Sequence, residues 1–66
     1  MNLFLNGEPQ TAPDGATVAA FLDSLGLPRT GIAVERNREI VPKSTYGVTQ
    51  LTEGDRIEIV QFVGGG

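Results

Sequence analysis

The sequence predicts a small α+β domain in which a mixed sheet of four to five strands packs one face against a single helix. Apolar and polar residues alternate near the start, in the middle and near the end of the chain, as in half-buried strands. One segment instead has apolar residues at the i, i+3, i+4, i+7 spacing of an amphipathic helix. The 66 residues have room for one domain, which we expect over residues 1–63, with a flexible tail at 64–66.

The first element is predicted to be a hairpin. In MNLFLN, Leu3 and Leu5 share one face, which we expect to point towards the core. Asn6-Gly7 is a strong hairpin signal because both residues tolerate a positive φ. The strand that follows contains Pro9, which suits an edge position because proline cannot donate a ladder hydrogen bond.

The helix is predicted within TVAAFLDSLGL. Its apolar stripe consists of Val18, Phe21, Leu22 and Leu25. Thr17 is a favourable N-cap, worth about 1 kcal/mol relative to alanine. Gly26 suits the position just past the helix, and Pro28 prevents its continuation.

The C-terminal half is predicted to supply the remaining strands. GIAVERN alternates, with Ile32 and Val34 facing inward, and NREIVP indicates a turn and a short strand ended by Pro42. KSTYGVTQ is irregular, with room for one short helical turn. TEGD is a tight turn in which Gly54 can take a positive φ, and RIEIVQFV is the last strand.

An apolar surface is predicted on the outer face of the sheet. Alternation in the last strand places Val60 and Phe62 on the face of Glu58, away from the helix, and Phe4 also faces outward. If the two strands are neighbours, these residues and Val63 form a docking surface for a partner. The alternatives are that isolated apolar residues on a surface are normal, or that a bulge resets the register.

Composition excludes several classes of function. The chain has no Cys, His or Trp, which removes disulfides, Cys/His metal sites and catalysis by an imidazole base. A net charge of −3 disfavours nucleic-acid binding. No apolar run could span a membrane and the start does not resemble a signal peptide, so we expect a cytoplasmic protein. The carboxylates lie mostly at turns or on outward faces, and we expect no metal, bound cofactor or catalytic side chain.

The terminal QFVGGG leaves the chain end as a candidate reactive group. A carboxylate can be activated as an acyl-adenylate with ATP, and glycine can enter a narrow channel because it has no Cβ. On the glycines alone, a frayed end or a cloning remnant explains the tail equally well.

The whole chain resembles the ThiS family, the ubiquitin-like β-grasp sulfur carriers of thiamine biosynthesis. The resemblance lies in the start MNLFLNGE, the helix segment GATVAAFL, the block GIAVERNREIVPKSTY, the turn segment LTEGDRIEIV and the ending VGGG. Gly65 and Gly66 match the family diglycine, whereas Gly64 occupies a position where the family pattern is looser.

The resemblance implies a protein that is acted on and is not itself an enzyme. A ubiquitin-activating-type adenylyltransferase would use Mg-ATP to adenylate the carboxylate of Gly66, with Gly64, Gly65 and Gly66 inserted into its active site. Sulfur from a cysteine desulfurase would replace AMP to give a thiocarboxylate, which thiazole synthase would use. The free carrier is expected to be a monomer.

Other functions stay open at this point. The molybdopterin synthase small subunit uses the same fold and ending, although the short chain and the NREIVP block favour the thiamine carrier. A carrier for another sulfur product, such as a thiolated tRNA or an amino acid, is a third reading. A ubiquitin-like tag or a plain interaction module would belong to a different class.

Overall fold

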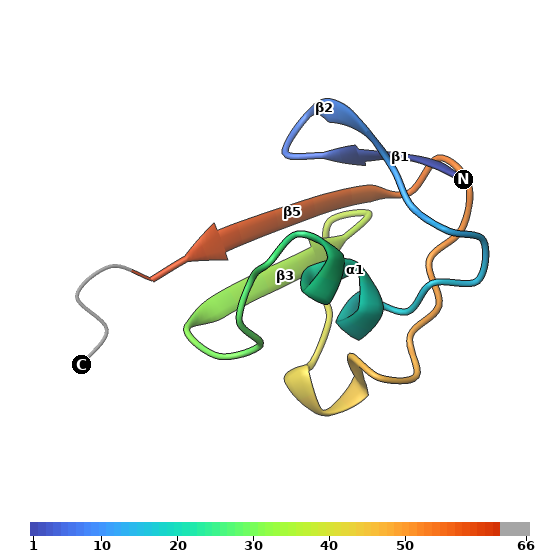
Figure 1. Cartoon of the computed structure of the whole chain (residues 1–66). Helices are drawn as coiled ribbons and strands as arrows, with labels where there is room; N and C mark the ends of the chain where they lie inside the picture. Colours follow the sequence, from blue (N-terminus) through green and yellow to red (C-terminus); the bar gives the residue numbers. More distant parts are fainter. Residues whose placement is uncertain (63–66) are drawn as a thin grey trace.

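A five-stranded sheet and one α-helix form the domain, and the computed structural model describes residues 1–62 (Figure 1). The elements are β1 (Asn2–Leu5), β2 (Glu8–Thr11), α1 (Val18–Ser24), β3 (Ile32–Arg36), β4 (Glu39–Ile40), a 3₁₀ turn η1 (Lys43–Thr45) and β5 (Arg56–Gln61). The predicted mixed sheet, single helix and short helical turn are confirmed. Val63 and the predicted tail at 64–66 lie outside the described residues.

The last strand occupies the centre of the sheet. The strand order is β2-β1-β5-β3-β4, and Figure 1 shows β5 running between β1 and β3. β1 and β5 are parallel, whereas the other three neighbouring pairs are antiparallel. β2 lies at one edge, as its Pro9 predicted. The strand that leads to the C-terminus is therefore flanked on both sides.

Two-residue turns join the outer strand pairs. Asn6 and Gly7 have φ of 50° and 84°, and Asn37 and Arg38 have φ of 53° and 70°. Positive φ at both central residues defines the type I′ turn, whose twist matches that of the flanking strands. The predicted Asn6-Gly7 hairpin is confirmed, and so is the positive φ of Gly54, at 82°.

The predicted ends of α1 are confirmed. The Thr17 hydroxyl oxygen accepts a hydrogen bond from the N–H three residues further on, at 3.1 Å. At the other end, Gly26 has a φ of 72°, and the Gly26 and Leu27 N–H groups each donate to a carbonyl of the last turn at 3.0 Å. This is a Schellman motif, which satisfies carbonyls that the helix leaves free.

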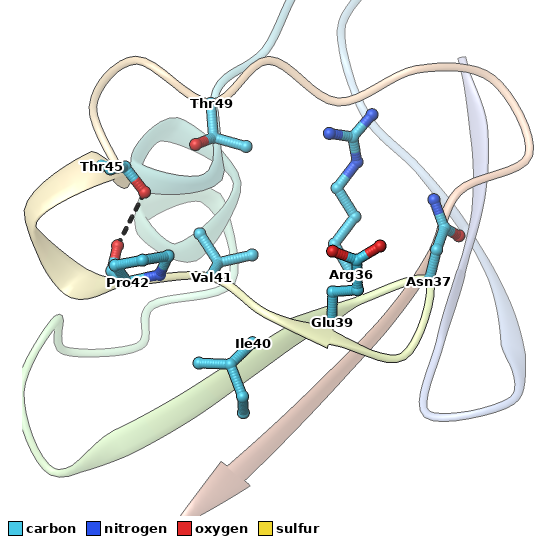
Figure 2. A pocket seen from close by; sticks show the side chains of 8 residues that line it. All are labelled: Arg36, Asn37, Glu39, Ile40, Val41, Pro42, Thr45 and Thr49. Carbon is cyan, nitrogen blue, oxygen red and sulfur yellow. Dashed lines mark hydrogen bonds between the residues drawn. The ribbon is translucent and has the colours of Figure 1, made fainter.

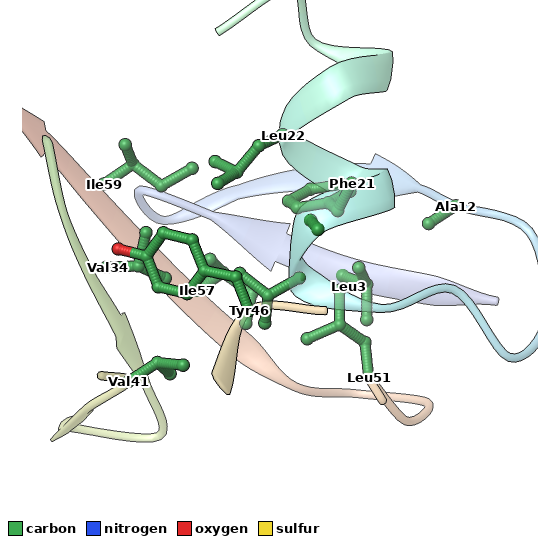
Figure 3. Close-up of a cluster of buried hydrophobic side chains, with 12 residues drawn as sticks. Leu3, Ala12, Phe21, Leu22, Val34, Val41, Tyr46, Leu51, Ile57 and Ile59 are labelled. Carbon is green, nitrogen blue, oxygen red and sulfur yellow. The ribbon is translucent and has the colours of Figure 1, made fainter. Parts of the chain in front are cut away.

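The core lies between α1 and one face of the sheet, where apolar side chains from both meet (Figure 3). Leu3, Val34 and Ile57 from three neighbouring strands are each 1% exposed, which confirms their predicted direction. Tyr46, from the segment predicted to be irregular, is also buried in this cluster. Among residues 1–62 no helix covers the opposite face of the sheet, which is called the outer face below.

Candidate functional site

The C-terminal end of β5 presents apolar side chains on the outer face. Val60 is 58% exposed and Phe62 is 61% exposed, whereas Ile57 and Ile59 point towards the helix and are buried. The predicted alternation is therefore confirmed, without a bulge that would reverse it. The role of Val60 and Phe62 in partner docking stays a prediction.

Phe4 lies on the outer face but at the other end of β5. β1 and β5 are neighbours, and the register pairs Phe4 with Arg56. The Arg56 guanidinium lies over the Phe4 ring, 4.8 Å from its centroid, in cation–π geometry. Val60 is four residues further along β5, or about 13 Å at the rise of an extended strand. The structure thus does not bring Phe4 next to Val60 and Phe62.

The middle of the outer face carries two carboxylates and an apolar residue. Glu35 of β3 and Glu58 of β5 are register partners, and Ala33 lies opposite Val60. Ile40 of β4 pairs with Glu35 and is 65% exposed. Ile40 was not among the site residues predicted from the sequence, although a two-residue turn at 37–38 places it on this face.

The end of β5 is held from both sides. On the β3 side, Gln61 pairs with Ile32, and the Phe62 N–H donates to the Gly31 carbonyl at 2.9 Å. On the β1 side, the Asn6 side chain makes hydrogen bonds to Ile59 of β5, a contact that was not predicted from the sequence. Gly64, Gly65 and Gly66, the predicted reactive tail, lie outside the described residues.

Asp55 lies beside the turn before β5, as the sequence predicts, but its side chain is buried, which the sequence did not predict. It is 5% exposed. Its carboxylate accepts hydrogen bonds from the Arg36 guanidinium (2.8 Å), the Asn37 amide (3.1 Å), and the N–H (2.8 Å) and hydroxyl (3.0 Å) of Thr52. Burial raises the pKa of Asp55, but these hydrogen bonds outweigh burial and hold the pKa below its usual value of 3.8. This carboxylate joins the turn before β5 to the β3–β4 hairpin.

A shallow hollow of about 350 Å³ lies beside β4 and η1 (Figure 2). Its lining residues are Arg36, Asn37, Glu39, Ile40, Val41, Pro42, Thr45 and Thr49. The Arg36 guanidinium is already paired with Asp55, and the Thr45 hydroxyl donates to the Pro42 carbonyl at 2.8 Å. Both of these polar groups are thus engaged in hydrogen bonds within the chain itself.

Within residues 1–62, side chains do not assemble a metal site. No group of three or more Asp or Glu side chains in this range is placed to hold an ion. Over the same residues, no helix is long and apolar enough to cross a membrane. The candidate site is therefore the end of β5 together with the residues that follow it.

Comparison with known proteins identifies the family. The model of the ThiS family matches residues 3–66, nearly the whole chain and all three terminal glycines. The chain belongs to the ThiS family. The sulfur carrier protein ThiS of Bacillus subtilis is 43% identical over 65 residues, which cover 97% of this chain and 98% of that protein.

A solved structure supports the same assignment. The crystal structure of the thiamine biosynthesis protein ThiS from Geobacter metallireducens matches with a TM-score of 0.85 and 32% identity, and covers 100% of both chains. The mixed five-stranded sheet on one helix is thus the ubiquitin-like β-grasp fold of ThiS proteins.

Two relatives are much longer proteins. Thiazole synthases from Magnetococcus marinus and Paramagnetospirillum magneticum are 47% and 48% identical over 66 residues. The match covers 100% of this chain but 20% of each synthase, so the chain spans about a fifth of their length. In these relatives a ThiS-like segment is thus part of a protein named for thiazole synthesis.

Proposed function

We propose that this chain is a sulfur carrier of thiamine biosynthesis that carries sulfur on the carboxylate of Gly66. The observation that carries the proposal is the ThiS family match, which extends through the terminal glycines. The near full-length similarity to the Bacillus subtilis sulfur carrier supports it. The chain has no Cys or His, and a carrier needs neither because its partners supply the catalytic groups.

The first step of the proposed cycle is adenylation by a ubiquitin-activating-type enzyme. One oxygen of the Gly66 carboxylate forms a bond to the α-phosphorus of Mg-ATP, the bond to the bridging oxygen breaks, and pyrophosphate leaves. The product is a glycyl adenylate, in which AMP is a good leaving group. Glycine suits this end because it lets the carboxylate pass through a narrow channel without a Cβ to clash.

Sulfur then replaces AMP. A persulfide sulfur derived from a cysteine desulfurase attacks the glycyl carbonyl carbon, and AMP leaves to give an acyl disulfide. A thiol supplies two electrons to break the S–S bond, which leaves the thiocarboxylate on Gly66. The absence of cysteine helps here, because the activated end meets no thiol of its own chain.

We further propose that thiazole synthase takes the sulfur from Gly66. The two longer relatives, in which a ThiS-like segment belongs to a thiazole synthase, support this partner. The exposed Val60 and Phe62 next to the end of β5 offer an apolar contact close to the reacting end. Docking there would present the tail and the surface together.

Two measurements test the proposed function. The matched activating enzyme should catalyse ATP–pyrophosphate exchange that depends on this chain. After addition of a cysteine desulfurase, cysteine and a thiol, intact mass should rise by the replacement of one oxygen by sulfur, and an alkylating reagent should label only that species. Because oxidation adds nearly the same mass, the alkylation is the deciding readout. Recovery of Gly66 joined to target lysines, without an alkylatable product, would instead favour a protein tag.

A further inference from the structure

The contact between β1 and β5 continues through a side chain after the backbone pairing has ended. The last register pair is Leu5 with Ile57, and the Asn6 N–H donates to the Ile57 carbonyl at 2.9 Å. The Asn6 side chain then reaches the next residue of β5 on that side. Its Oδ1 accepts from the Ile59 N–H at 2.9 Å, and its Nδ2 donates to the Ile59 carbonyl at 3.3 Å.

The Asn6 carboxamide thus replaces a peptide group of the ladder. A side-chain amide offers the same N–H donor and carbonyl acceptor as a backbone peptide. The backbone cannot make this pair itself, because it leaves the sheet at Asn6 and Gly7 with φ of 50° and 84°. Asp or Gly would serve the first turn position equally well, so the turn alone does not explain an amide here.

The contact lies where β5 has little other support on this side. Among residues 1–62, the Asn6 amide makes the last hydrogen-bonding contact that the β1–β2 hairpin has along β5. A hollow of about 130 Å³ opens beside it, lined by Leu5, Asn6, Leu27, Ile59 and Gln61. The two hydrogen bonds to Ile59 therefore hold β5 on the side away from β3.

We propose that Asn6 is a positioning residue for the chemistry at Gly66, an inference that rests on the carrier function proposed above. Asn6 holds the β1 side of β5 at Ile59, while β3 holds the other side as far as Phe62. With both sides held, the end of the strand that precedes the terminal carboxylate keeps one position. At a rise of about 3.3 Å per residue, Phe62 lies about 10 Å beyond Ile59, so a rotation of the strand by a few degrees at Ile59 moves Phe62 by about 1 Å. A misplacement of 1 Å can cost about 100-fold in rate.

Two substitutions remove the contact while keeping a residue that suits the turn. Asn6→Gly removes both hydrogen bonds, and Asn6→Asp keeps the acceptor but sets a carboxylate oxygen against the Ile59 carbonyl. Asn37→Gly is the matched control. Asn37 holds the same position in the other two-residue turn, with a φ of 53°, but its side chain bonds Asp55 and the Arg56 N–H at the start of β5.

The experiment is ATP–pyrophosphate exchange with the matched activating enzyme, at a temperature where circular dichroism shows each variant folded. Both Asn6 variants should lower kcat about tenfold or more and change the KM for the carrier much less, because the docking surface is intact. Asn37→Gly should leave both constants close to the parent values. Amide hydrogen exchange of Ile59 should become faster in Asn6→Gly than in the parent and in Asn37→Gly.

The inference is overturned if Asn6→Gly keeps the parental kcat, if Asn37→Gly lowers kcat equally, or if Ile59 exchange does not change. If both Asn6 variants fail to fold, the role of Asn6 is structural, and the inference is overturned in that case as well. Absence of exchange activity with the parent chain would overturn the proposed carrier function, and this inference with it. The Ile59 amide measurement separates these failures, because it needs no partner enzyme.

Discussion

At the scale of single residues, Asp55 links stability to pH. Its folded-state pKa lies below the usual value of 3.8, because hydrogen bonds from Thr52, Asn37 and Arg36 outweigh the effect of burial. As the pH falls below about 3.8, the unfolded chain takes up a proton before the folded chain does. The stabilisation is therefore present above this pH and is lost as the pH falls through the folded-state pKa.

Asp55→Asn should lower the free energy of unfolding at pH 7 by about 1–3 kcal/mol, because an amide turns an N–H group towards donors that lose their acceptor. Asp23→Asn is the control: Asp23 pairs with Arg29, but its side chain is 60% exposed, and exposed pairs contribute about 0–1 kcal/mol. Urea unfolding measures both. The difference between Asp55→Asn and the parent should shrink as the pH falls below about 3.8 and through the lowered pKa of Asp55, where the parent carboxylate also takes up a proton. A difference that stays constant down the acid range would contradict the lowered pKa.

The sequence predicted single positions well where a local pattern decides them. Thr17, Gly26 and Gly54 follow from helix caps and turns, and their geometry is as predicted. The burial of Asp55 was missed because its partners Arg36 and Asn37 are distant in the sequence. The Asn6 side-chain contact was also missed, because Ile59 is distant from Asn6 in the sequence. In addition, the Asn6-Gly7 turn signal already accounted for an asparagine at this position.

At the scale of elements, periodicity predicted the strands and the helix but not their order in the sheet. Alternation of apolar and polar residues predicts which face of a strand is buried, but it does not predict which strands lie beside it in the sheet. In the structure, β5 lies between β1 and β3 and runs parallel to β1. This pairing brings together segments that are separated by most of the chain, so no local pattern predicts it. The position of Phe4 relative to Val60 depends on this register, so the proposed patch could not be tested by pattern alone.

Gly26 provides an element-scale prediction, because it ends α1 with a φ of 72° while a Cβ built there meets nothing within 4 Å. Gly26→Ala should therefore destabilise the fold by about 1 kcal/mol through backbone strain alone. Gly47→Ala is the matched control, since the site is equally open and lacks a φ in the left-handed range. Thermal unfolding compares the two. An equal change in both variants would show that the left-handed conformation is not the cause.

At the scale of the whole molecule, Val60 and Phe62 lie on the outer face at the C-terminal end of β5. The helix covers the opposite face, so Val60 and Phe62 are accessible without any rearrangement of the core. Phe4, with Arg56 over its ring, lies further back along the strand. We therefore expect the contribution to docking to be concentrated at Val60 and Phe62, with Phe4 contributing less.

Phe62→Ala and Val60→Asp should each weaken binding to the activating enzyme by more than about 1 kcal/mol, as expected for a central apolar contact. Both should fold, because the side chains are more than half exposed. Val48→Asp is the control: Val48 is 77% exposed but lies in the loop after η1, outside the sheet. Titration calorimetry measures the affinities. Parental affinity in folded Phe62→Ala and Val60→Asp would reject this face as the docking surface.

The position of the terminal carboxylate gives the last prediction. Deleting Gly66 leaves a glycine carboxylate about 3.5 Å short of its place, and adding one alanine after Gly66 carries it too far and adds a methyl group. Reacting atoms must approach within about 3–3.5 Å, so both variants should lose ATP–pyrophosphate exchange by 100-fold or more. Both should keep the parental fold and affinity for the activating enzyme, because the core and the surface at Val60 and Phe62 are unchanged. Loss of affinity would instead make the tail a binding element, and near-parental exchange would mean that chain length does not position the carboxylate, contrary to the proposed mechanism.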